Sequence, residues 1–186
     1  DFPIIPNPHS SEFLTLQAVD LISGISSVIN SVSNLEIKPE ITGVLVHIKE
    51  DSLCFVATDS FRLSEKVVNV PIPNKFTSRI IIPKRCCDGI LRIFQNIDMN
   101  LHIEISDSQI MIKNEPQDTL VPKIRFIGRL IDGEYPNYEQ IIPKSFSKIV
   151  EVSKDALMQR IKTASLFSNK INEITCAVDA KKQQLE

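Results

Sequence analysis

The feature that most limits the folds open to this chain is a succession of five expected elements that occurs twice between residues 12 and 131. Each copy predicts one strand, one helix and three further strands. The expected strands cover 12–16, 41–48, 53–58 and 62–70 in the first copy, and 79–82, 101–105, 110–112 and 123–131 in the second. Two such units can bury two helices against a shared antiparallel sheet, so the pattern predicts an α+β fold.

Both expected helices carry an apolar stripe at helical spacing. The stripes consist of Ala18, Leu21, Ile22, Ile25, Val28, Ile29 and Val32 in the first helix and Cys87, Ile90, Leu91 and Phe94 in the second. The second helix should open at Pro83, because proline loses nothing at the first helical position. The other face of the first helix holds serine and asparagine. We interpret it as a neutral surface or as a face that lies close to a partner.

Composition and charge are those of a soluble globular protein. Hydrophobic residues make up 42% of the 186 residues and charged residues 24%, which is enough to bury a proper core. No apolar run is long enough to span a membrane, and no signal peptide opens the chain. The formal net charge is −2, so a role with nucleic acid would need a local basic face.

The cysteines and histidines predict no metal site and no cofactor. Cys86 and Cys87 are adjacent, unlike the spaced pairs of zinc sites, and the histidines are scattered. Cys54 and Cys176 lie in apolar strand patterns. We therefore expect buried free thiols in a reducing cytoplasm.

Residues 55–64 predict a strand, a tight polar turn and a second strand. Asp59 and Ser60 suit a turn, because their side chains can bond to nearby backbone amides. Arg62 follows at once and could pair with Asp59 across the turn. The alternative is an ordinary hairpin with a surface ion pair that contributes little.

The start of the second helix combines Lys84 and Arg85, whose charges oppose the helix dipole. Cations and free amides at one helix end make a good phosphate site. Arg92 lies two turns further on the same polar face. The alternative is that Asp88 offsets both cations through contacts within the helix.

Residues 130–138 combine an Asp-Gly turn with Tyr135-Pro136-Asn137-Tyr138. One interpretation is a domain boundary held by two aromatic rings. The other is an aromatic and proline pocket for a peptide.

The sequence does not support catalysis, because no nucleophile and base stand together and no glycine loop could cradle a phosphate. An enzyme built around Asp59, Arg62 and Asp132 remains as an alternative hypothesis. It requires these three side chains to converge on one deep pocket.

A second, longer repeat concerns domain organisation. Residues 40–46 resemble residues 173–179, and each follows a helical pattern, with Ser153 as the expected N-cap of the later helix. We expect a linker or the end of a preceding domain at 1–11, a complete domain at 12–143 and the truncated start of another at 147–186. The chain would then be a fragment of a longer protein.

Three motifs now converge: residues 57–63 (Ala-Thr-Asp-Ser-Phe-Arg-Leu), 81–85 (Ile-Ile-Pro-Lys-Arg) and 130–138 (Leu-Ile-Asp-Gly-Glu-Tyr-Pro-Asn-Tyr). Their order and spacing resemble the middle domain of the bacterial replicative sliding clamp family, the beta subunit of DNA polymerase III. The resemblance covers nearly the whole chain and implies a DNA-clamp fold made of two β-α-β-β-β units.

The same resemblance implies a processivity factor without catalysis, acting in the cytoplasm. A homodimeric ring of six like domains would encircle duplex DNA without sequence specificity. The polymerase III alpha subunit, the clamp loader and other proteins with a clamp-binding motif would each dock a short peptide on the middle domain. The alternative function is a peptide-binding scaffold that does not encircle DNA.

Matching positions with the family assigns two sets of residues. The peptide pocket would use Ile41, Thr58, Ser60, Phe61, Arg62, Leu63, Pro136, Gln140 and Ile141. Lys84, Arg85 and Arg92 would face the DNA. The family usually reads Thr-Asp-Gly-His-Arg-Leu at the turn, so Ser60 and Phe61 depart from it. Serine has fewer backbone options than glycine, and Phe61 makes the rim more apolar.

Overall fold

A computed structural model describes residues 12–35, 37–72, 76–114, 116, 122–147, 149–168, 174–179 and 184–185. The expected linker at 1–11 and part of the expected repeat at 173–179 lie outside these residues. The chain divides into two compact units, residues 1–137 and 138–186, which are described separately.

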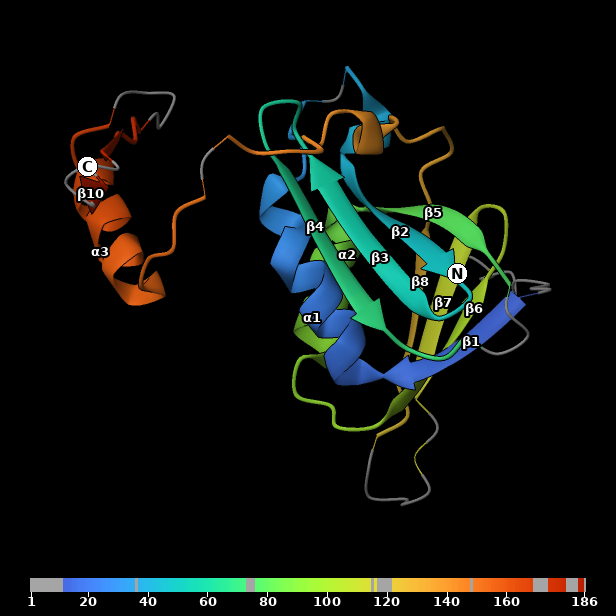
Figure 1. The fold of residues 1–186 in the computed structure, drawn as a ribbon. Helices are drawn as coiled ribbons and strands as arrows, with labels where there is room; N and C mark the ends of the chain where they lie inside the picture. The colour runs from blue at the N-terminus through green and yellow to red at the C-terminus, as the bar shows by residue number, and fades with distance from the viewer. Residues whose placement is uncertain are drawn as a thin grey trace. The chain divides into compact units, whose positions relative to one another are not determined.

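The first unit contains the two expected runs of strand, helix and three strands (Figure 1). The first run consists of β1 (Glu12–Gln17), α1 (Ala18–Val28), β2 (Gly43–Lys49), β3 (Ser52–Thr58) and β4 (Leu63–Asn69). The second consists of β5 (Ser78–Pro83), α2 (Lys84–Phe94), β6 (Asn100–Ile105), β7 (Gln109–Asn114) and β8 (Arg125–Arg129). Short 3₁₀ helices follow α1 and precede β2, namely η1 (Ile29–Ser31) and η2 (Pro39–Ile41). Pro83 ends β5 and stands at the N-cap, so α2 opens one residue later than expected.

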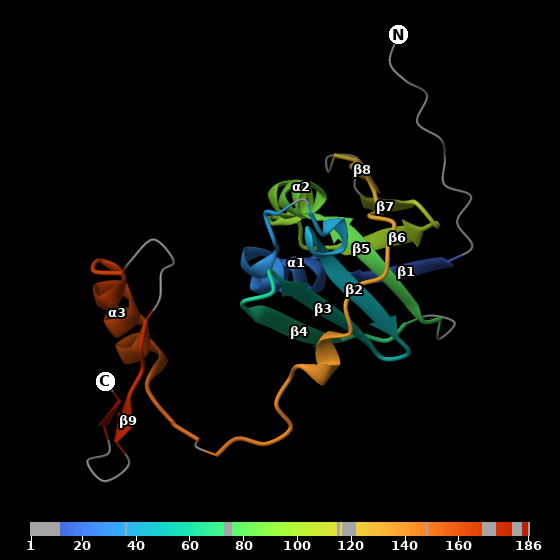
Figure 2. The ribbon, with the colours of Figure 1, turned by 90° about the horizontal axis from the view of Figure 1, so that it is seen from above.

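We expected one shared sheet, but the structure contains two four-stranded antiparallel sheets. Each of these sheets takes strands from both runs. The β2 sheet has the order β4-β3-β2-β5, and the β6 sheet has the order β1-β6-β7-β8. β5 therefore pairs with β2 of the first run, and β1 pairs with β6 of the second. Helix α1 packs against α2, β3 and β4, and α2 packs against β2, β5 and β8. Figure 2 shows the two helices side by side.

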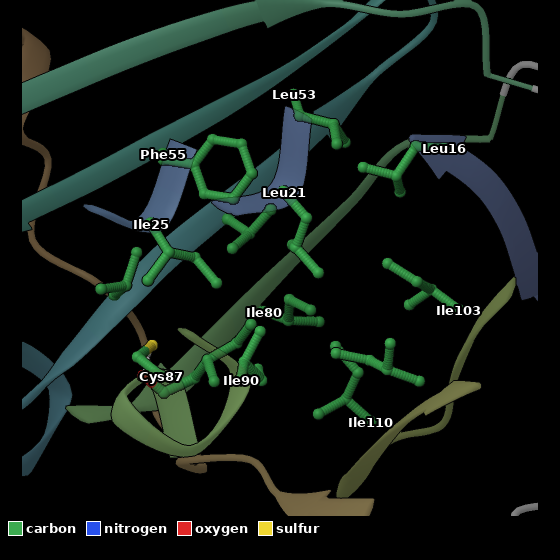
Figure 3. Packing of buried hydrophobic residues seen from close by; sticks show 14 of the residues in the cluster. Leu16, Leu21, Ile25, Leu53, Phe55, Ile80, Cys87, Ile90, Ile103 and Ile110 are labelled. Atoms are coloured by element: carbon green, nitrogen blue, oxygen red, sulfur yellow. Dashed lines mark hydrogen bonds between the residues drawn. The ribbon is translucent and has the colours of Figure 1, made fainter. Parts of the chain in front are cut away.

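One apolar core joins both sheets and both helices (Figure 3). Phe55 of β3 and Ile25 of α1 are fully buried, and Ile90 of α2 and Ile110 of β7 lie in the same cluster. Burying one such side chain contributes about 1.5–3 kcal/mol. Both predicted helical stripes face this core, with only Ile22 and Leu91 partly exposed. The fold therefore depends on hydrophobic contacts between the two runs.

The second unit contains η4 (Tyr138–Gln140), α3 (Lys154–Ser165) and a short hairpin of β9 (Val178–Asp179) with β10 (Gln184–Leu185). Ser153 is the N-cap of α3, as expected, and its hydroxyl accepts the Ala156 N–H at 3.5 Å. The strand expected at 173–179 appears only as β9 among the described residues. Cys176 is exposed, whereas a buried thiol was expected. Among the described residues, no helix has the length and apolar character that a membrane span requires.

Replacing Gly24 by alanine should destabilise the first unit. A Cβ atom there would overlap the Phe55 ring, because Gly24 lies at the contact between α1 and β3. Overpacking costs about 1–3 kcal/mol, whereas the gain in helix propensity from Gly to Ala is about 1 kcal/mol. We expect Gly24→Ala to lower the free energy of unfolding by up to about 2 kcal/mol in urea titration. Ser26→Ala on the exposed face should change it by less than about 0.5 kcal/mol.

Candidate functional site

The turn between β3 and β4 is held by its own side chains. Asp59 Oδ1 accepts the backbone N–H groups of Phe61 and Arg62, each at 3.0 Å. The Thr58 hydroxyl donates to the Arg62 carbonyl at 2.8 Å and accepts the Ser60 N–H at 3.1 Å. Because Thr58 and Leu63 are paired in the ladder, these bonds close a rigid loop of four residues.

Ser60 adopts a left-handed backbone with φ of 76°, the conformation that glycine takes most easily. A non-glycine residue there costs roughly 1–2 kcal/mol. The hydrogen bonds from Asp59 and Thr58 hold the turn in this conformation. The next side chain, Phe61, is 94% exposed at the tip of the turn.

The predicted pairing of Asp59 with Arg62 is confirmed, with 3.1 Å between Arg62 Nε and Asp59 Oδ2. Partial burial by itself would raise the pKa of Asp59. The backbone N–H donors of Arg62 and Phe61, together with the Arg62 guanidinium, outweigh that effect and lower the pKa below the usual 3.8. The carboxylate is therefore charged at neutral pH and serves as a structural anchor for the turn.

A second segment reaches the same end of the β2 sheet. Residues 130–137, here called the crossing segment, leave β8 and continue past β5, because the Ile131 N–H donates to the Ile81 carbonyl at 2.9 Å. A Cβ atom on Gly43 would lie 3.0 Å from Ile131 Cδ1, so glycine at this position lets the segment approach β2. Gly133, with φ of +150°, then lies beside Glu40 of η2.

Tyr135 completes the path of the crossing segment. Its side chain is buried, and its hydroxyl lies beside the backbone of Thr58 at the end of β3. Burial raises the pKa of Tyr135 to about 12, and the nearby Thr58 backbone offsets a part of that rise. The hydroxyl has no hydrogen bond of good geometry within the described part of the chain. Tyr135 therefore fixes the position of the exposed Pro136 next to the turn.

The structure brings together the predicted pocket residues of the first unit. β2 begins, β3 ends and β4 begins at one end of the sheet, which places Ile41, Thr58 and Leu63 near one another. Ile41 and Thr58 are buried, Leu63 is half-buried, and Ser60, Phe61, Arg62 and Pro136 are exposed. Gln140 and Ile141 are exposed residues of the second unit, so their predicted place in the pocket stays a prediction.

The predicted DNA-facing cations lie along α2. Lys84 is half-buried and donates from Nζ to Asn34 Oδ1 at 3.0 Å, whereas Arg85 and Arg92 are exposed. Asp88 forms no ion pair with Lys84 or Arg85 within the described residues, so the alternative, an offset by Asp88 through direct contacts, is not supported. Asn34 is closer to the Lys84 ammonium than any acidic group that the structure describes.

The exposed face of α1 has no cation or anion from residue 23 to residue 30. Ser26 and Ser27 are exposed and bond back to the Ser23 carbonyl at 3.3 and 2.7 Å. Because both hydroxyls already donate to a carbonyl of their own helix, they are poor hydrogen-bond donors for an anion. The paired helices thus present cations on α2 beside a neutral surface on α1.

The two predicted sites share one piece of backbone. The Lys84 N–H donates to the Thr42 carbonyl at 3.2 Å, and the Ser33 N–H donates to the Ile41 carbonyl at 3.1 Å. Residues 41–42 therefore lie between the start of α2 and the loop that carries Asn34. This bonding fixes the position of the buried Ile41 relative to the helix face.

The enzyme hypothesis is not supported by the geometry. The Arg62 side chain is 67% exposed, and Asp132 is exposed on the crossing segment. Neither lies in the deep pocket that the hypothesis requires. Within the described residues, no cluster of His, Cys, Asp or Glu side chains could hold a metal ion.

Two residues were missed among the site candidates. Tyr135 was noted in its motif but not placed in the pocket, and Asn34 was not singled out as a partner for Lys84. The apolar Tyr-Pro pair next to a glycine turn was the available signal for Tyr135. The Lys84–Asn34 contact joins residues 50 positions apart and left no signal in the sequence.

A family model described as the central domain of the DNA polymerase III beta subunit matches residues 15–137 of the chain. The chain belongs to this family, as the three motifs predicted. The beta sliding clamp of Synechococcus elongatus is 29% identical over 189 residues, covering 100% of this chain and 48% of that protein. The clamp of Bacillus subtilis is 24% identical over 181 residues, covering 97% and 46%.

Solved structures give the same result for the fold. The crystal structure of the Bacillus subtilis DNA polymerase sliding clamp matches with a TM-score of 0.82 and 25% sequence identity. The match covers 91% of this chain and 43% of that one. This likeness confirms the DNA-clamp fold. The chain spans about half the length of the curated relatives it matches.

The turn should lose stability in acid. The pKa of Asp59 is lower in the folded protein than its usual value of 3.8. The charged carboxylate therefore stabilises the fold fully above pH 3.8, and this stabilisation is lost as the pH falls through the lowered pKa. We expect wild type to be more stable than Asp59→Asn at pH 7, and the difference to shrink below pH 3.8, measured by urea unfolding. A difference that is constant from pH 7 to pH 2 would contradict a charged anchor. Asp107→Asn, in an exposed turn of the β6 sheet, is the matched control.

Removing the Tyr135 hydroxyl should not weaken the fold. Its oxygen is buried without a well-formed hydrogen bond among described residues, so the nearby Thr58 backbone compensates only a part of its desolvation. Removing such a hydroxyl raises the free energy of unfolding by about 1 kcal/mol or leaves it unchanged. We expect Tyr135→Phe to match or exceed wild type in thermal unfolding, whereas Tyr135→Ala should lose about 3–5 kcal/mol. A marked loss in Tyr135→Phe would mean that the hydroxyl has a strong partner.

Proposed function

We propose that this chain is the middle part of a bacterial replicative sliding clamp, a processivity factor that holds duplex DNA and docks partner proteins without catalysis. Residues 12–143 would form one clamp domain and residues 147–186 the start of the next, with 1–11 ending the domain before. The whole protein would be a homodimeric ring in the bacterial cytoplasm. Family membership and the fold support this proposal.

The observation that carries the proposal is the separation of two surfaces in one unit. The helices α1 and α2 combine exposed Arg85 and Arg92 with a neutral row of serines. Such a surface attracts phosphates without sequence readout and leaves DNA free to move. Rigid helices place these charges at fixed distances, which suits sliding better than a mobile loop would.

The second surface is the end of the β2 sheet, formed by the turn and the crossing segment. It includes the exposed Phe61 and Pro136 and the half-buried Leu63, and the hydrogen bonds within the turn hold its backbone before any ligand binds. A preorganised apolar surface with backbone nearby fits a short linear peptide. The proposed partners are the polymerase alpha subunit, the clamp loader and other proteins with a clamp-binding motif.

Charge removal on α2 should separate the two activities. We expect Lys84→Gln with Arg85→Gln to weaken binding of a labelled duplex and to reduce the salt slope by about 2, because each phosphate contact contributes about 0.9. The measurement is fluorescence anisotropy of the 186-residue chain at several salt concentrations. Affinity for a short glutamine- and leucine-rich peptide should not change, whereas Arg62→Ala should lower it.

The matched control replaces Arg125 and Arg129 of β8 by glutamine. Gly128 and Phe126 of that strand face α2, so the alternate residues point away from the helices. This control should leave the salt slope nearly unchanged. If both charge pairs have the same effect, or neither has one, the helix face does not bind DNA. Intact peptide binding would then favour the scaffold that does not encircle DNA.

A further inference from the structure

The outer face of the β6 sheet carries a row of polar and charged side chains that neither of the proposed surfaces uses. Thr15, His102, Lys113 and Arg125 are successive cross-strand partners on β1, β6, β7 and β8. Side chains alternate between the two faces of a strand, and a residue next to each of these four belongs to the core or packs against it. The row therefore lies on the face of the sheet that points away from the core.

Three cations gather where this row meets the ends of β7 and β8. Lys113, Lys123 and Arg125 line one hollow of about 550 Å³. Lys123 and Arg125 are exposed, whereas Lys113 is half-buried, with its Nζ 3.0 Å from a carboxylate oxygen of Glu104. Glu104 offsets one of these three positive charges. The described residues thus leave a net positive charge at the hollow, which attracts anions although the whole chain has a formal charge of −2.

Asn114 holds the stretch of chain that carries two of these cations. Its Nδ2 donates to the Pro122 carbonyl at 3.0 Å, and its Oδ1 accepts the Ile124 N–H at 2.6 Å. Asn114 is itself buried. Lys123 lies between the two residues that Asn114 holds, so an anion that binds there does not have to order this backbone.

A second hollow, of about 210 Å³, shares Lys113 with the first. It is also lined by Phe13, His102 and Glu104. The Phe13 ring is 53% exposed, and a hydrogen bond of 3.2 Å joins His102 Nδ1 to the Thr15 hydroxyl. The same face of the sheet therefore offers an exposed aromatic ring on β1 and exposed cations on the β8 side.

A ring and cations on one sheet face fit single-stranded nucleic acid. Cations bind the backbone phosphates of a single strand, and aromatic rings stack on its unpaired bases. Neighbouring strands lie about 4.8 Å apart, so the three steps from β1 to β8 span roughly 14 Å, which is room for a few nucleotides. An acidic peptide would need only the cations. A duplex keeps its bases paired and cannot stack one on Phe13.

We propose that the outer face of the β6 sheet binds single-stranded nucleic acid, with phosphates at Lys123 and Arg125 and a base stacked on Phe13. This site goes beyond the proposed clamp function, because it uses neither the helices nor the turn after β3. Its ligand also differs from the duplex proposed for the helix face.

The test is fluorescence anisotropy of the 186-residue chain with a short labelled oligothymidine at several salt concentrations. We expect Phe13→Ala to weaken binding at least about fivefold, the lower end of what stacking on one base contributes. Phe13→Tyr keeps the ring and should keep the affinity. Lys123→Gln with Arg125→Gln should reduce the salt slope by about 1.4, because each phosphate contact of a single strand contributes about 0.7.

Matched controls remove a ring and two charges from the second unit. Phe167→Ala deletes a ring that is 86% exposed, and Lys154→Gln with Lys162→Gln removes two exposed cations of α3. Neither control should change the affinity or the salt slope.

Three results would overturn the proposal. The first is oligothymidine binding that does not respond to Phe13→Ala, and the second is no saturable binding to wild type. The third is a polyglutamate peptide that displaces the oligonucleotide and binds wild type and Phe13→Ala equally well, which would identify the face as a site for acidic peptides.

Discussion

The exchange of strands between the two runs is the constraint on which the rest of the first unit depends. β5 completes the sheet of the first run, and β1 completes the sheet of the second. Without the other run, a backbone edge of β2 and of β6 would lack its hydrogen-bond partners. The apolar faces then meet in one core, where Ile25, Phe55 and Ile90 are buried together. Folding should therefore be cooperative across residues 12–129.

The candidate docking site follows from this exchange. Because β5 lies at the edge of the β2 sheet, the crossing segment can bond to Ile81 as it leaves β8. It then passes Gly43 and Glu40 and buries Tyr135 beside Thr58. Two stretches more than 70 residues apart thus meet at one sheet end. The fold assembles the surface, and the turn supplies its rigidity.

Much of the fold was predictable from the sequence because its signals are local. Alternation and turn residues located the strands, and the 3.6-residue period located the buried faces of α1 and α2. The Asp59–Arg62 pair was predictable because three positions separate its members. The motifs also predicted the family, since each combines residue types that are unusual together.

The remaining features depend on contacts between distant residues. Alternation shows which face of a strand is buried but not which strand is its neighbour, so the two sheets were expected as one. Lys84 pairs with Asn34 rather than Asp88 because the loop after α1 approaches the start of α2. Cys176 follows an apolar pattern yet lies before β9 and is exposed, because a local pattern does not show whether other residues pack over it.

We propose that the turn and the crossing segment form one peptide-docking surface, separate from the helix face. The most direct measurement is a titration of the ¹⁵N-labelled chain with the glutamine- and leucine-rich peptide, followed by amide chemical shifts. We expect the largest shifts at residues 58–63 and at Tyr135, with little change along Lys84–Phe94. Largest shifts on α1 and α2, with residues 58–63 unchanged, would contradict it.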